Sequence, residues 1–407
     1  MAFRDYAKRP EAGEPSCLPC AGTPGGGIWP PPDMVPAAGE DGKTYSALAM
    51  RVLIVGKGPP ERGGIAAMVE ILRQRLAADN EVELLNLTRD QIPRCGRMST
   101  QNIRRTLEDS LRVWRVGRGW DIVDIHSALT PLVTISRAGL LALVARARGA
   151  HVVVHAHGGN LQTWLDSRSK RLATRIALSA AHGIVAVSQG VHDSLADVVG
   201  PGRVRLVDNG IDVERFRPNG RVHHPPRVLY VGLLTPRKGV VDLLHASEVL
   251  RSRRVPHELV LVGGTPDEGP DAEAEVRAVA GDGVIFQGVR AHEQMPEVYW
   301  EADVFCLASW WEAMPLSVLE AMASGIPVVA TRVGDIPRIV EDGLTGILVP
   351  AKDPEALANA LEVYLADSTR RRAAGQAGRE RVEQNYSVEA MVLATVDAYH
   401  AVMSPAG

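Results

Sequence analysis

Strands and helices alternate along most of this sequence, and this alternation limits the possible folds more than any other feature. The segment RVLIVG at 51–56 has the composition of a fully buried strand. Further strands are expected at 82–87 and 121–127, and within 151–160 and 183–190. Strands that alternate with helices form parallel sheets with helices on both faces. The sequence therefore predicts an α/β protein.

A second series of the same kind begins at 227–232, where RVLYVG repeats the character of the first strand. A chain of 407 residues is too long for one ordinary core. We therefore expect two doubly wound, Rossmann-like domains, at 50–222 and 223–385, and a helix within 386–407 that crosses back to the first domain. The Pro- and Gly-rich segment 1–49 is expected to be a disordered tail. An upstream start codon is an alternative explanation of this tail, since Met50 directly precedes the first strand.

The composition is that of a globular protein, with 45% hydrophobic and 23% charged residues. No apolar run reaches the roughly 18 residues that a membrane-spanning helix needs, and no secretory signal is expected at the N-terminus. Four cysteines are too few for a disulfide framework, and Cys306 lies inside an apolar strand. A plain tail is a simpler interpretation of the lone C-x-x-C pair, Cys17 and Cys20, than a metal or redox site. We therefore expect reduced thiols and a cytoplasmic protein.

Charge is distributed unevenly. Residues 50–220 carry 24 Lys and Arg against 16 Asp and Glu, whereas residues 221–407 carry 17 against 26. A basic half beside an acidic half indicates that one half meets an anionic surface or acceptor. The helix expected at 101–116 has an apolar stripe formed by Ile103, Leu107, Leu111 and Trp114. Its arginines lie elsewhere around the helix. We favour an ordinary packed surface helix, and a helix that lies on an anionic membrane is the alternative.

The segment 308–350 combines a buried helix with two acids. The helix is expected to begin with Pro315 at its first position and to end before Gly325, and a strand follows at 328–330. It is apolar on nearly every face, which is typical of a buried helix, and Glu320 is its only charge. A buried carboxylate is costly unless a cation or the hydrogen-bond donors of a ligand satisfy it. Glu312 precedes the same helix by a few residues.

Two loops are suited to binding an anion. Gly63 and Gly64 stand where the first helix begins, and bare backbone amides there can approach a negative group. A tight turn between strand and helix is the alternative interpretation of this pair. The second loop carries Arg237 and Lys238, followed by Gly239, so that two cations stand beside the N-terminal amides of a helix. This second arrangement favours a diphosphate.

Two histidines stand near the end of the strand in 151–160. Polar side chains at the carboxyl end of a parallel strand face the ligand crevice. His155 and His157 have the spacing of metal ligands on a strand, but no further His, Cys or acid cluster is expected to complete a site. We therefore expect no metal, and one histidine that contacts substrate. No Ser-His-Asp or Cys-His constellation indicates a protein nucleophile.

The order and spacing of these motifs resemble retaining glycosyltransferases of family 4, or glycosyl transferases group 1, whose architecture is called GT-B. The resemblance extends from Arg51 to about the C-terminus. Glu312 and Glu320 match the E-x7-E motif of the family, within the phrase E-x-x-P-L-x-x-L-E-A-M-A-x-G-x-P-V-V-A. The N-G-x-D-x-x-x-F motif is matched by Asn209, Gly210, Asp212 and Phe216. The R-K-G motif is matched by Arg237, Lys238 and Gly239. The N-terminal landmarks are matched by Gly63, Gly64, His157 and Gly158.

The resemblance implies two domains that face each other across a cleft, with a nucleotide-sugar donor bound by the second domain. Glu320 would accept hydrogen bonds from the ribose, and Glu312 would contact hydroxyls of the donor sugar. Phosphate would meet the amides of Leu316 and Ser317, since Pro315 has no N–H. Charge on the departing diphosphate would be neutralised by Lys238 and Arg237, and His157 would line the cleft. The other residues implied in donor binding are Gly63, Gly64, Gly232, Gly263 and Asn209.

The implied reaction is a retaining, metal-independent transfer, in which the nucleotide-diphosphate sugar is a substrate and no cofactor is needed. The acceptor would be a lipid-linked saccharide, a polysaccharide or a small molecule, in cell-envelope or exopolysaccharide synthesis. The basic first domain would contact the inner face of the plasma membrane peripherally, and no nucleic acid is expected. A catalytically silent scaffold and a nucleotide-sugar epimerase are the alternatives. Two positions depart from the family. Leu233 stands where an arginine that contacts phosphate is common, so Arg62 or Arg237 would supply that contact. Met314 stands where the family has an aromatic residue.

Overall fold

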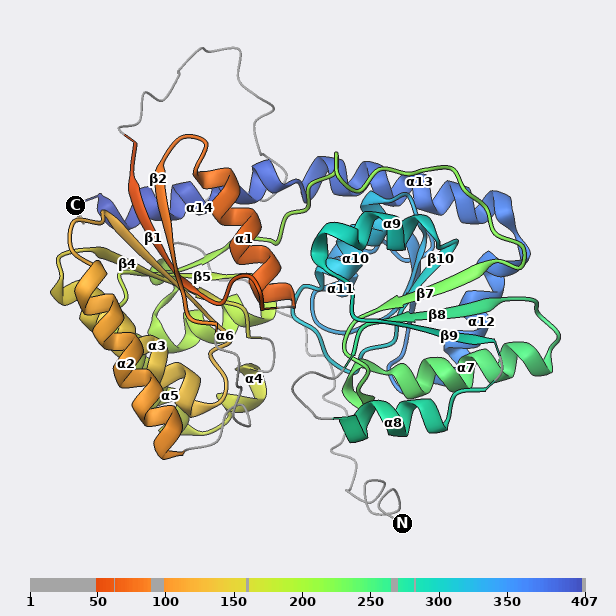
Figure 1. Ribbon diagram of the computed structural model, residues 1–407, viewed down its shortest axis with the longest axis horizontal. Coiled ribbons are helices and arrows are strands. Elements are labelled where there is room, and N and C mark those ends of the chain that lie inside the picture. Colours follow the sequence, from red (N-terminus) through yellow and green to blue (C-terminus); the bar gives the residue numbers. More distant parts are fainter. Residues whose placement is uncertain are drawn as a thin grey trace, which may run out of the picture. The chain divides into compact units, whose positions relative to one another are not determined.

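The computed structural model describes residues 49–61, 63–88, 99–158, 161–264, 270–281 and 283–404 (Figure 1). The expected tail, with Cys17 and Cys20, lies outside the described residues apart from Ala49, and so does Arg62. Within the described residues the chain forms two parallel sheets of six strands each. This arrangement confirms the predicted α/β fold with two doubly wound domains.

The first sheet has the strand order β2-β1-β3-β4-β5-β6, and all neighbouring strands are parallel. Its strands are β1 Arg51–Gly56, β2 Glu81–Asn86, β3 Ile122–Ser127, β4 His151–Ala156, β5 Gly183–Ala186 and β6 Val204–Leu206. The order reverses between β1 and β3. Ligands of open α/β sheets bind beyond the carboxyl ends of the strands at such a reversal.

The second sheet repeats this plan with the order β12-β11-β10-β7-β8-β9. Its strands are β7 Arg227–Val231, β8 Glu258–Val262, β9 Val284–Gly288, β10 Val304–Leu307, β11 Val328–Thr331 and β12 Gly346–Val349. The reversal lies between β7 and β10. The loops that follow these two strands therefore meet at the point where a ligand is expected.

Helices connect the strands of both sheets (Figure 1). Those of the first half are α1 Gly64–Leu76, α2 Thr100–Val116, α3 Leu132–Ala147, α4 Leu161–Trp164, α5 Arg168–Ala177 and α6 Gln189–Val199. Those of the second half are α7 Val240–Ser252, α8 Pro270–Ala278, α9 Met295–Trp300, α10 Leu316–Ala323, α11 Ile336–Ile339, α12 Pro354–Ala366, α13 Ser368–Asn385 and α14 Val388–Met403. Across the described ranges, no helix has both the length and the apolar character to cross a membrane.

The predicted buried helix is α10, and it is buried on nearly every side. It begins one residue later than predicted, because Pro315 has an extended backbone with ψ of 120° and caps the helix instead of opening it. The chain leaves the helix through Gly325, whose φ of 71° is in the left-handed region that favours glycine. Strand β11 then begins at Val328, as predicted.

The apolar stripe of α2 points to solvent, so the packed surface helix that we favoured was wrong for this face. Its four side chains are 46–59% exposed: Ile103, Leu107, Leu111 and Trp114. The helix instead buries Asp109, Ser110 and Val113. Helical spacing identified the stripe, but it did not show which face of the helix meets the sheet.

The chain passes between the two sheets twice, and the two passages are hydrogen-bonded to each other. The backbone N–H of Ile211 donates to the carbonyl of Tyr386 at 2.9 Å, and the N–H of Val388 donates to the carbonyl of Ile211 at 3.0 Å. Beyond this point α14 packs on α1, β4 and β5 of the first half. Its Val388, Met391 and Tyr399 are buried there in one apolar cluster with residues of β1 and α1.

Candidate active site

The loops after β7 and β10 bring two of the predicted residues into direct contact. Lys238 ends a short 3₁₀ turn, Pro236–Lys238, and its Nζ donates to Oε1 of Glu312 at 2.6 Å. The hydroxyl of Ser309 donates to the same oxygen at 2.7 Å. Glu312 is only 8% exposed, so this ion pair is largely shielded from water. A cation and an acid are thus fixed together at the strand reversal of the second sheet.

Two glycines allow the backbone to approach closely enough to form this pair. Gly239 follows Lys238 with φ of 67°, and a Cβ there would lie 1.8 Å from the carbonyl oxygen of Ala308. Gly334 has φ of 55°, and a Cβ there would lie 2.1 Å from the carbonyl oxygen of Glu312. A side chain at position 239 would push the loops after β7 and β10 apart, and one at position 334 would push the segment after β11 away from Glu312.

Arg237 lies at the exposed rim of the same site. Its guanidinium stands 5.6 Å from the ring centre of Trp311, and its carbonyl accepts a hydrogen bond of 2.9 Å from the N–H of Trp310. The two loops are therefore joined through backbone as well as side chains. Arg237 and Lys238 place two cations at one edge of the sheet.

The N-terminus of α10 lies beside the N-terminus of α1. The first N–H groups of a helix lack partners within it, and Pro315 contributes none, so Leu316 and Ser317 supply the leading amides of α10. Gly64 opens α1, and a Cβ on it would have Leu316 Cδ1 as its neighbour at 3.9 Å. Gly63 caps α1 with φ of 131° and would meet no atom within 4 Å. Two helix N-termini thus converge from the two halves of the chain.

Gly232 and Gly263, both assigned to donor binding, lie against each other just after β7 and β8. A Cβ on Gly263 would fall 1.8 Å from the carbonyl oxygen of Gly232, and Gly263 has φ of 141°. Close packing of these two strand ends therefore requires glycine at position 263. A contact between either glycine and a nucleotide stays a prediction.

Glu320 is buried on α10, with 5% of its surface exposed. The hydroxyl of Tyr299 donates to its Oε2 at 2.7 Å, and His292 Nδ1 lies 3.8 Å from Oε1. Burial raises the pKa of Glu320 to about 7, although the hydrogen bond from Tyr299 and the charge of Arg215 act in the opposite direction. The carboxyl group is therefore poised to gain from any further hydrogen-bond donor.

Asn209, for which the resemblance implies donor binding, contacts the segment that follows Glu312. Its Nδ2 donates to the carbonyl of Met314 at 2.9 Å, and its backbone N–H lies 3.1 Å from the sulfur of the same residue. Its buried Oδ1 has no partner among the described atoms. These contacts link the segment after β6 to the segment before α10. A contact with the donor stays a prediction.

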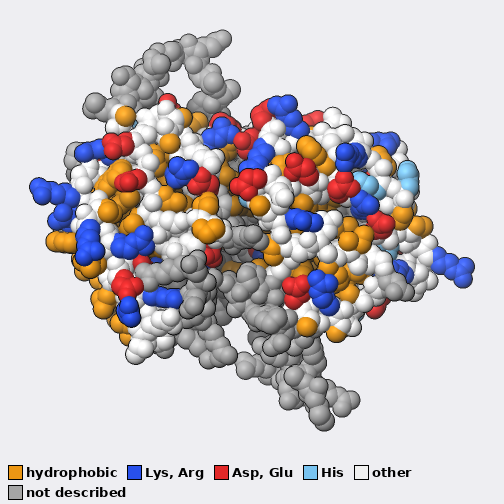
Figure 2. Space-filling view, in the orientation of Figure 1, with side chains coloured by type: hydrophobic (Ala, Val, Ile, Leu, Met, Phe, Trp, Pro, Cys, Tyr) orange, Lys and Arg blue, Asp and Glu red, His pale blue; other side chains and the backbone are white. Residues whose placement is uncertain are grey.

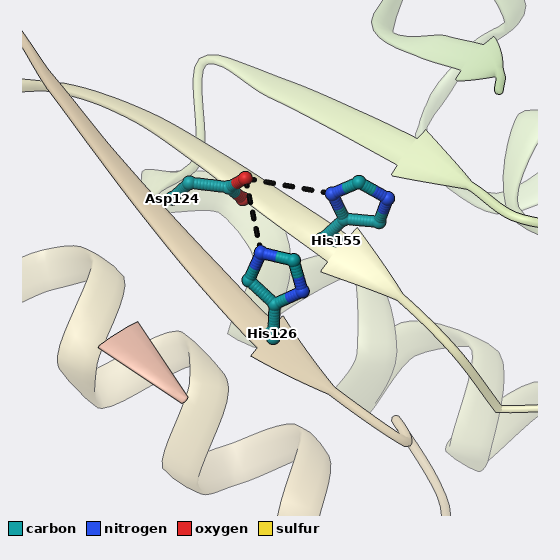
Figure 3. Close-up of side chains that lie close together, drawn as sticks. All are labelled: Asp124, His126 and His155. Carbon is teal, nitrogen blue, oxygen red and sulfur yellow. Dashed lines mark hydrogen bonds and ion pairs between the residues drawn. The ribbon is translucent and has the colours of Figure 1, made fainter. Parts of the chain in front are cut away.

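A cluster of polar side chains lies on neighbouring strands of the first sheet, toward their carboxyl ends (Figure 3). Asp124 and His126 stand on β3, and His155 stands on β4 directly opposite His126. Asp124 Oδ2 lies 3.2 Å from His126 Nε2 and 3.4 Å from His155 Nδ1 (Figure 3). His157 Nε2 lies 2.8 Å from His126 Nδ1. The expectation that no further histidine or acid stands beside His155 and His157 was therefore wrong.

The surroundings of this cluster set its charge. Burial alone would raise the pKa of Asp124, but His126 and His155 hold it well below its usual value, so the group is a carboxylate. Desolvation lowers the pKa of His155 and lowers that of His157 well below its usual value, and His126 adds to both effects. His155 and His157 are therefore neutral at neutral pH.

The signal for the two missed residues was present in the sequence. Asp124 and His126 are two residues apart on a strand and must share one face of the sheet. Their contact with the next strand depends on the register of β3 against β4, which pairs His126 with His155. Composition and periodicity do not determine that register.

Comparison with known proteins gives two matching families. The description "Glycosyltransferase Family 4" matches residues 62–215, and "Glycosyl transferases group 1" matches residues 225–367. Among solved structures, sucrose-phosphate synthase from Thermosynechococcus elongatus has the same fold, with a TM-score of 0.69 at 24% identity over 86% of this chain and 98% of that one. The fold is therefore GT-B.

Three curated relatives align with more than half of this chain. An alpha-maltose-1-phosphate synthase of Mycobacterium tuberculosis is 32% identical over 273 residues, which are 60% of this chain and 67% of the relative. A GDP-mannose-dependent alpha-(1-6)-phosphatidylinositol monomannoside mannosyltransferase of Mycolicibacterium smegmatis is 30% identical over 367 residues, 82% and 94% of the two chains. A GDP-mannose:cellobiosyl-diphosphopolyprenol alpha-mannosyltransferase of Xanthomonas oryzae is 25% identical over 368 residues, 86% and 96%. Together with the fold and the matched motifs, these similarities show that the chain belongs to glycosyltransferase family 4.

Proposed function

We propose that this protein transfers a sugar from a nucleotide-diphosphate donor to a hydroxyl of a lipid-linked or polysaccharide acceptor, with retention of anomeric configuration. The observation that carries the proposal is the contact between Lys238 and Glu312 at the strand reversal of the second sheet. A cation for phosphate and an acid for sugar hydroxyls thereby stand side by side. The named activities of the relatives, which form alpha linkages to saccharide or lipid-linked acceptors, support the same reading.

The diphosphate would lie between the N-termini of α10 and α1. Helix N-termini carry partial positive charge and unpaired N–H groups, which suit an anion. Leu316 and Ser317 offer amides from one side, and Gly63 and Gly64 leave the backbone of the other side open to a close approach. Because both helices contribute, the donor would bridge the two halves of the protein.

The two acids would bind different parts of the donor. Glu320 lies buried with a single strong hydrogen bond from Tyr299, and ribose hydroxyls would supply the further donors that a buried carboxylate needs. Glu312 lies one loop nearer the strand end and would accept hydrogen bonds from the transferred sugar. The ion pair between Glu312 and Lys238 keeps the Lys238 side chain oriented.

Chemistry would consist of one exchange at the anomeric carbon. The bond from that carbon to the diphosphate oxygen breaks, the acceptor oxygen bonds to the same face of the sugar, and the acceptor proton passes to the departing phosphate. Negative charge grows on the leaving group in the transition state, where preorganised cations are most effective. Lys238 and Arg237 would supply the positive charge that stabilises this leaving group. We therefore propose that the reaction needs neither a divalent cation nor a protein nucleophile.

An acceptor carried by lipid agrees with the exposed surface of the first half. Besides the stripe of α2, Leu172 and Ile176 of α5 are 59% and 65% exposed, and both helices pack on α3. Arg148 lies over the ring of Trp114 at 4.5 Å. Hydrophobic and basic side chains, with some acidic ones among them, are interspersed over the first half of the chain (Figure 2). We propose that this surface, formed by α2 and α5, contacts an anionic membrane from its cytoplasmic side.

A transfer assay tests the proposal. Thermal-shift screening over nucleotide diphosphates and their sugars would first identify the donor, and NMR of the product formed with a polyprenyl-diphosphate-linked saccharide would show retention. Glu320→Ala should lower the rate about 10- to 1,000-fold, since one or two hydrogen bonds to the donor are lost. The exposed acid Glu248 offers a control, and Glu248→Ala should leave the rate unchanged.

Other outcomes would identify the alternatives. Donor binding without turnover would favour a scaffold, and conversion of the donor without acceptor into its epimer would favour an epimerase. Loss of transfer after chelation, with recovery on adding Mg²⁺ or Mn²⁺, would contradict metal independence.

A further inference from the structure

A continuous chain of contacts leads from a buried acid in the first sheet to His157. Asp124 contacts His126, and His126 contacts His157, over 3.2 Å and 2.8 Å. Asp124 and His126 have buried side chains, whereas His157 follows β4 at the sheet edge and is partly exposed. The resemblance to family 4 implies a role in the cleft for His157 only. Asp124 and His126 therefore need a separate explanation.

The direction of each hydrogen bond follows from the charge of Asp124. A carboxylate only accepts, so His126 must carry its proton on Nε2 and His155 must carry its proton on Nδ1. The hydroxyl of Tyr399 donates to the same oxygen at 2.7 Å. Nδ1 of His126 faces Nε2 of His157 at 2.8 Å, so one proton lies between these two nitrogens. When His157 supplies this proton from Nε2, its own Nδ1 carries none.

We propose that Asp124 and His126 are positioning residues that fix the tautomer and ring orientation of His157, so that His157 presents Nδ1 as a hydrogen-bond acceptor to a hydroxyl of the bound sugar or acceptor. This inference rests on the proposed glycosyl transfer. It adds a fixed hydrogen-bond acceptor contributed by the first sheet. In this role His157 only accepts a hydrogen bond and transfers no proton. Its ring orientation is set before substrate binds.

Stacking of the rings supports a fixed orientation. The ring centres of His126 and His155 are 4.5 Å apart, and those of His155 and His157 are 4.9 Å apart, with interplanar angles of 19° and 8°. His157 is thus held on its flat face and at its Nε2 edge. Gly158 follows it directly, and a Cβ there would lie 1.5 Å from the carbonyl oxygen of Ala128, so the backbone is equally confined.

The same groups have spacings that a metal ion could use. Asp124, His126 and His155 are the one set of this kind in the described parts of the chain. However, each short contact is explained by a proton between a donor and the carboxylate, and Tyr399 adds one more donor to that oxygen. Of the described residues, the titratable groups that face His157 are Asp124, His126 and His155. Hydrogen bonding accounts for the contacts of Asp124 Oδ2, whereas the buried Oδ1 has no partner among the described atoms.

Histidine-labelled protein provides a test that does not depend on activity. Long-range ¹H–¹⁵N spectra report which ring nitrogen is protonated, and the variant His157→Gln assigns the signals of this residue. We expect Nε2 protonated and Nδ1 unprotonated in the wild type. In Asp124→Asn the amide can donate to His126, so the protonation pattern of His157 should change. Tyr399→Phe removes a hydrogen bond from the same oxygen and should leave that pattern unchanged.

Kinetics then test whether the effect passes through His157. Asp124→Asn should lower kcat on the order of 100-fold, which is typical of a small displacement of a positioning group. Combined with His157→Gln, it should cause little further loss, because the group that it orients is already gone. Three outcomes would overturn the proposal. The first is a double variant whose loss of kcat equals the product of the losses in the two single variants. The others are an unchanged His157 spectrum in Asp124→Asn and one equivalent of bound metal in the purified protein. A wild type with the expected spectrum but no transfer would instead contradict the proposed function.

Discussion

Tyr299 donates its hydroxyl to Glu320 at 2.7 Å, and both side chains are buried. The only ionisable side chain of α10 therefore accepts a hydrogen bond from a neutral hydroxyl group. Because burial raises the pKa of Glu320 to about 7, this acid is close to half ionised near neutral pH in the absence of ligand. A ligand that donates hydrogen bonds to it would favour the ionised form.

The pH dependence of stability should reveal this acid. Its pKa is about 7 in the fold against an ordinary value of 4.5, so the native state holds the proton more tightly than the unfolded chain does. The free energy of unfolding should therefore fall as pH rises from about 4.5 to 7, by up to about 3 kcal/mol. Glu320→Gln cannot titrate. Urea unfolding at pH 5 and pH 8 measures the free energy of unfolding of both proteins. Between these pH values the variant should gain most of this amount in stability relative to the wild type. The same difference in stability at both pH values would contradict the assignment.

Donor affinity should show the opposite trend. Ribose hydroxyls donate hydrogen bonds, so the ionised form of Glu320 should bind the donor more tightly, and wild-type affinity should rise between pH 6 and pH 8. In Glu320→Gln this part of the pH dependence should disappear. Calorimetric titration with the donor identified by screening measures both. Equal pH dependence in the two proteins would separate Glu320 from donor binding.

Lys238 should act mainly in the transition state. Lys238→Ala should lower kcat about 100- to 1,000-fold with a smaller change in donor KM, since charge on the leaving group grows as the bond breaks. Lys352 offers a matched control, because its ammonium lies 4.5 Å from the ring of the neighbouring Trp310 and not on Glu312. Lys352→Ala should retain wild-type kcat. A loss confined to KM in Lys238→Ala would indicate ground-state binding only.

The glycine after Lys238 should be irreplaceable for steric reasons. Gly239→Ala combines a left-handed backbone with a Cβ placed 1.8 Å from the carbonyl of Ala308. Gly220 has a similar φ of 71° but no atom within 4 Å of a Cβ, so Gly220→Ala measures the backbone term alone, about 1–2 kcal/mol. Gly239→Ala should cost clearly more in urea unfolding. Similar losses in both variants would show that the loop adjusts freely.

The exposed stripe of α2 should determine membrane binding. Leu107→Glu and Leu111→Glu together should abolish co-sedimentation with anionic liposomes, because they remove apolar area and add repulsion. Leu393 on α14 is 67% exposed and lies outside the surface formed by α2 and α5, so Leu393→Glu is the control. It should leave binding intact. Equal partitioning of the wild type to neutral and anionic vesicles would argue against an electrostatic contribution.

Much of the fold follows from the sequence alone. Apolar runs such as 51–56 and 227–232 predict the strands, and their alternation with helices predicts two parallel sheets. The acid pair at Glu312 and Glu320 was found because a charge in a buried helix is conspicuous. These features are local, so one sequence contains them in full.

The rest depends on relations between distant segments. The register of β3 against β4 places Asp124 and His126 beside His155, and no local pattern specifies it. The outward direction of the α2 stripe depends on what the helix packs against. Asn209 contacts Met314, which lies 105 positions further along the chain. Tertiary packing decides each of these, and periodicity does not report it.

The last helix has a consequence for biosynthesis. Residues of α14 cover the apolar face formed by β1 and α1, and Tyr399 donates a hydrogen bond to the buried Asp124 of β3. A nascent chain that has emerged only as far as β6 therefore lacks a part of its first core that arrives almost 200 residues later. That apolar face stays uncovered while the second sheet is translated, and such exposed surface favours aggregation. The first half of this chain therefore completes its core only when α14 has emerged.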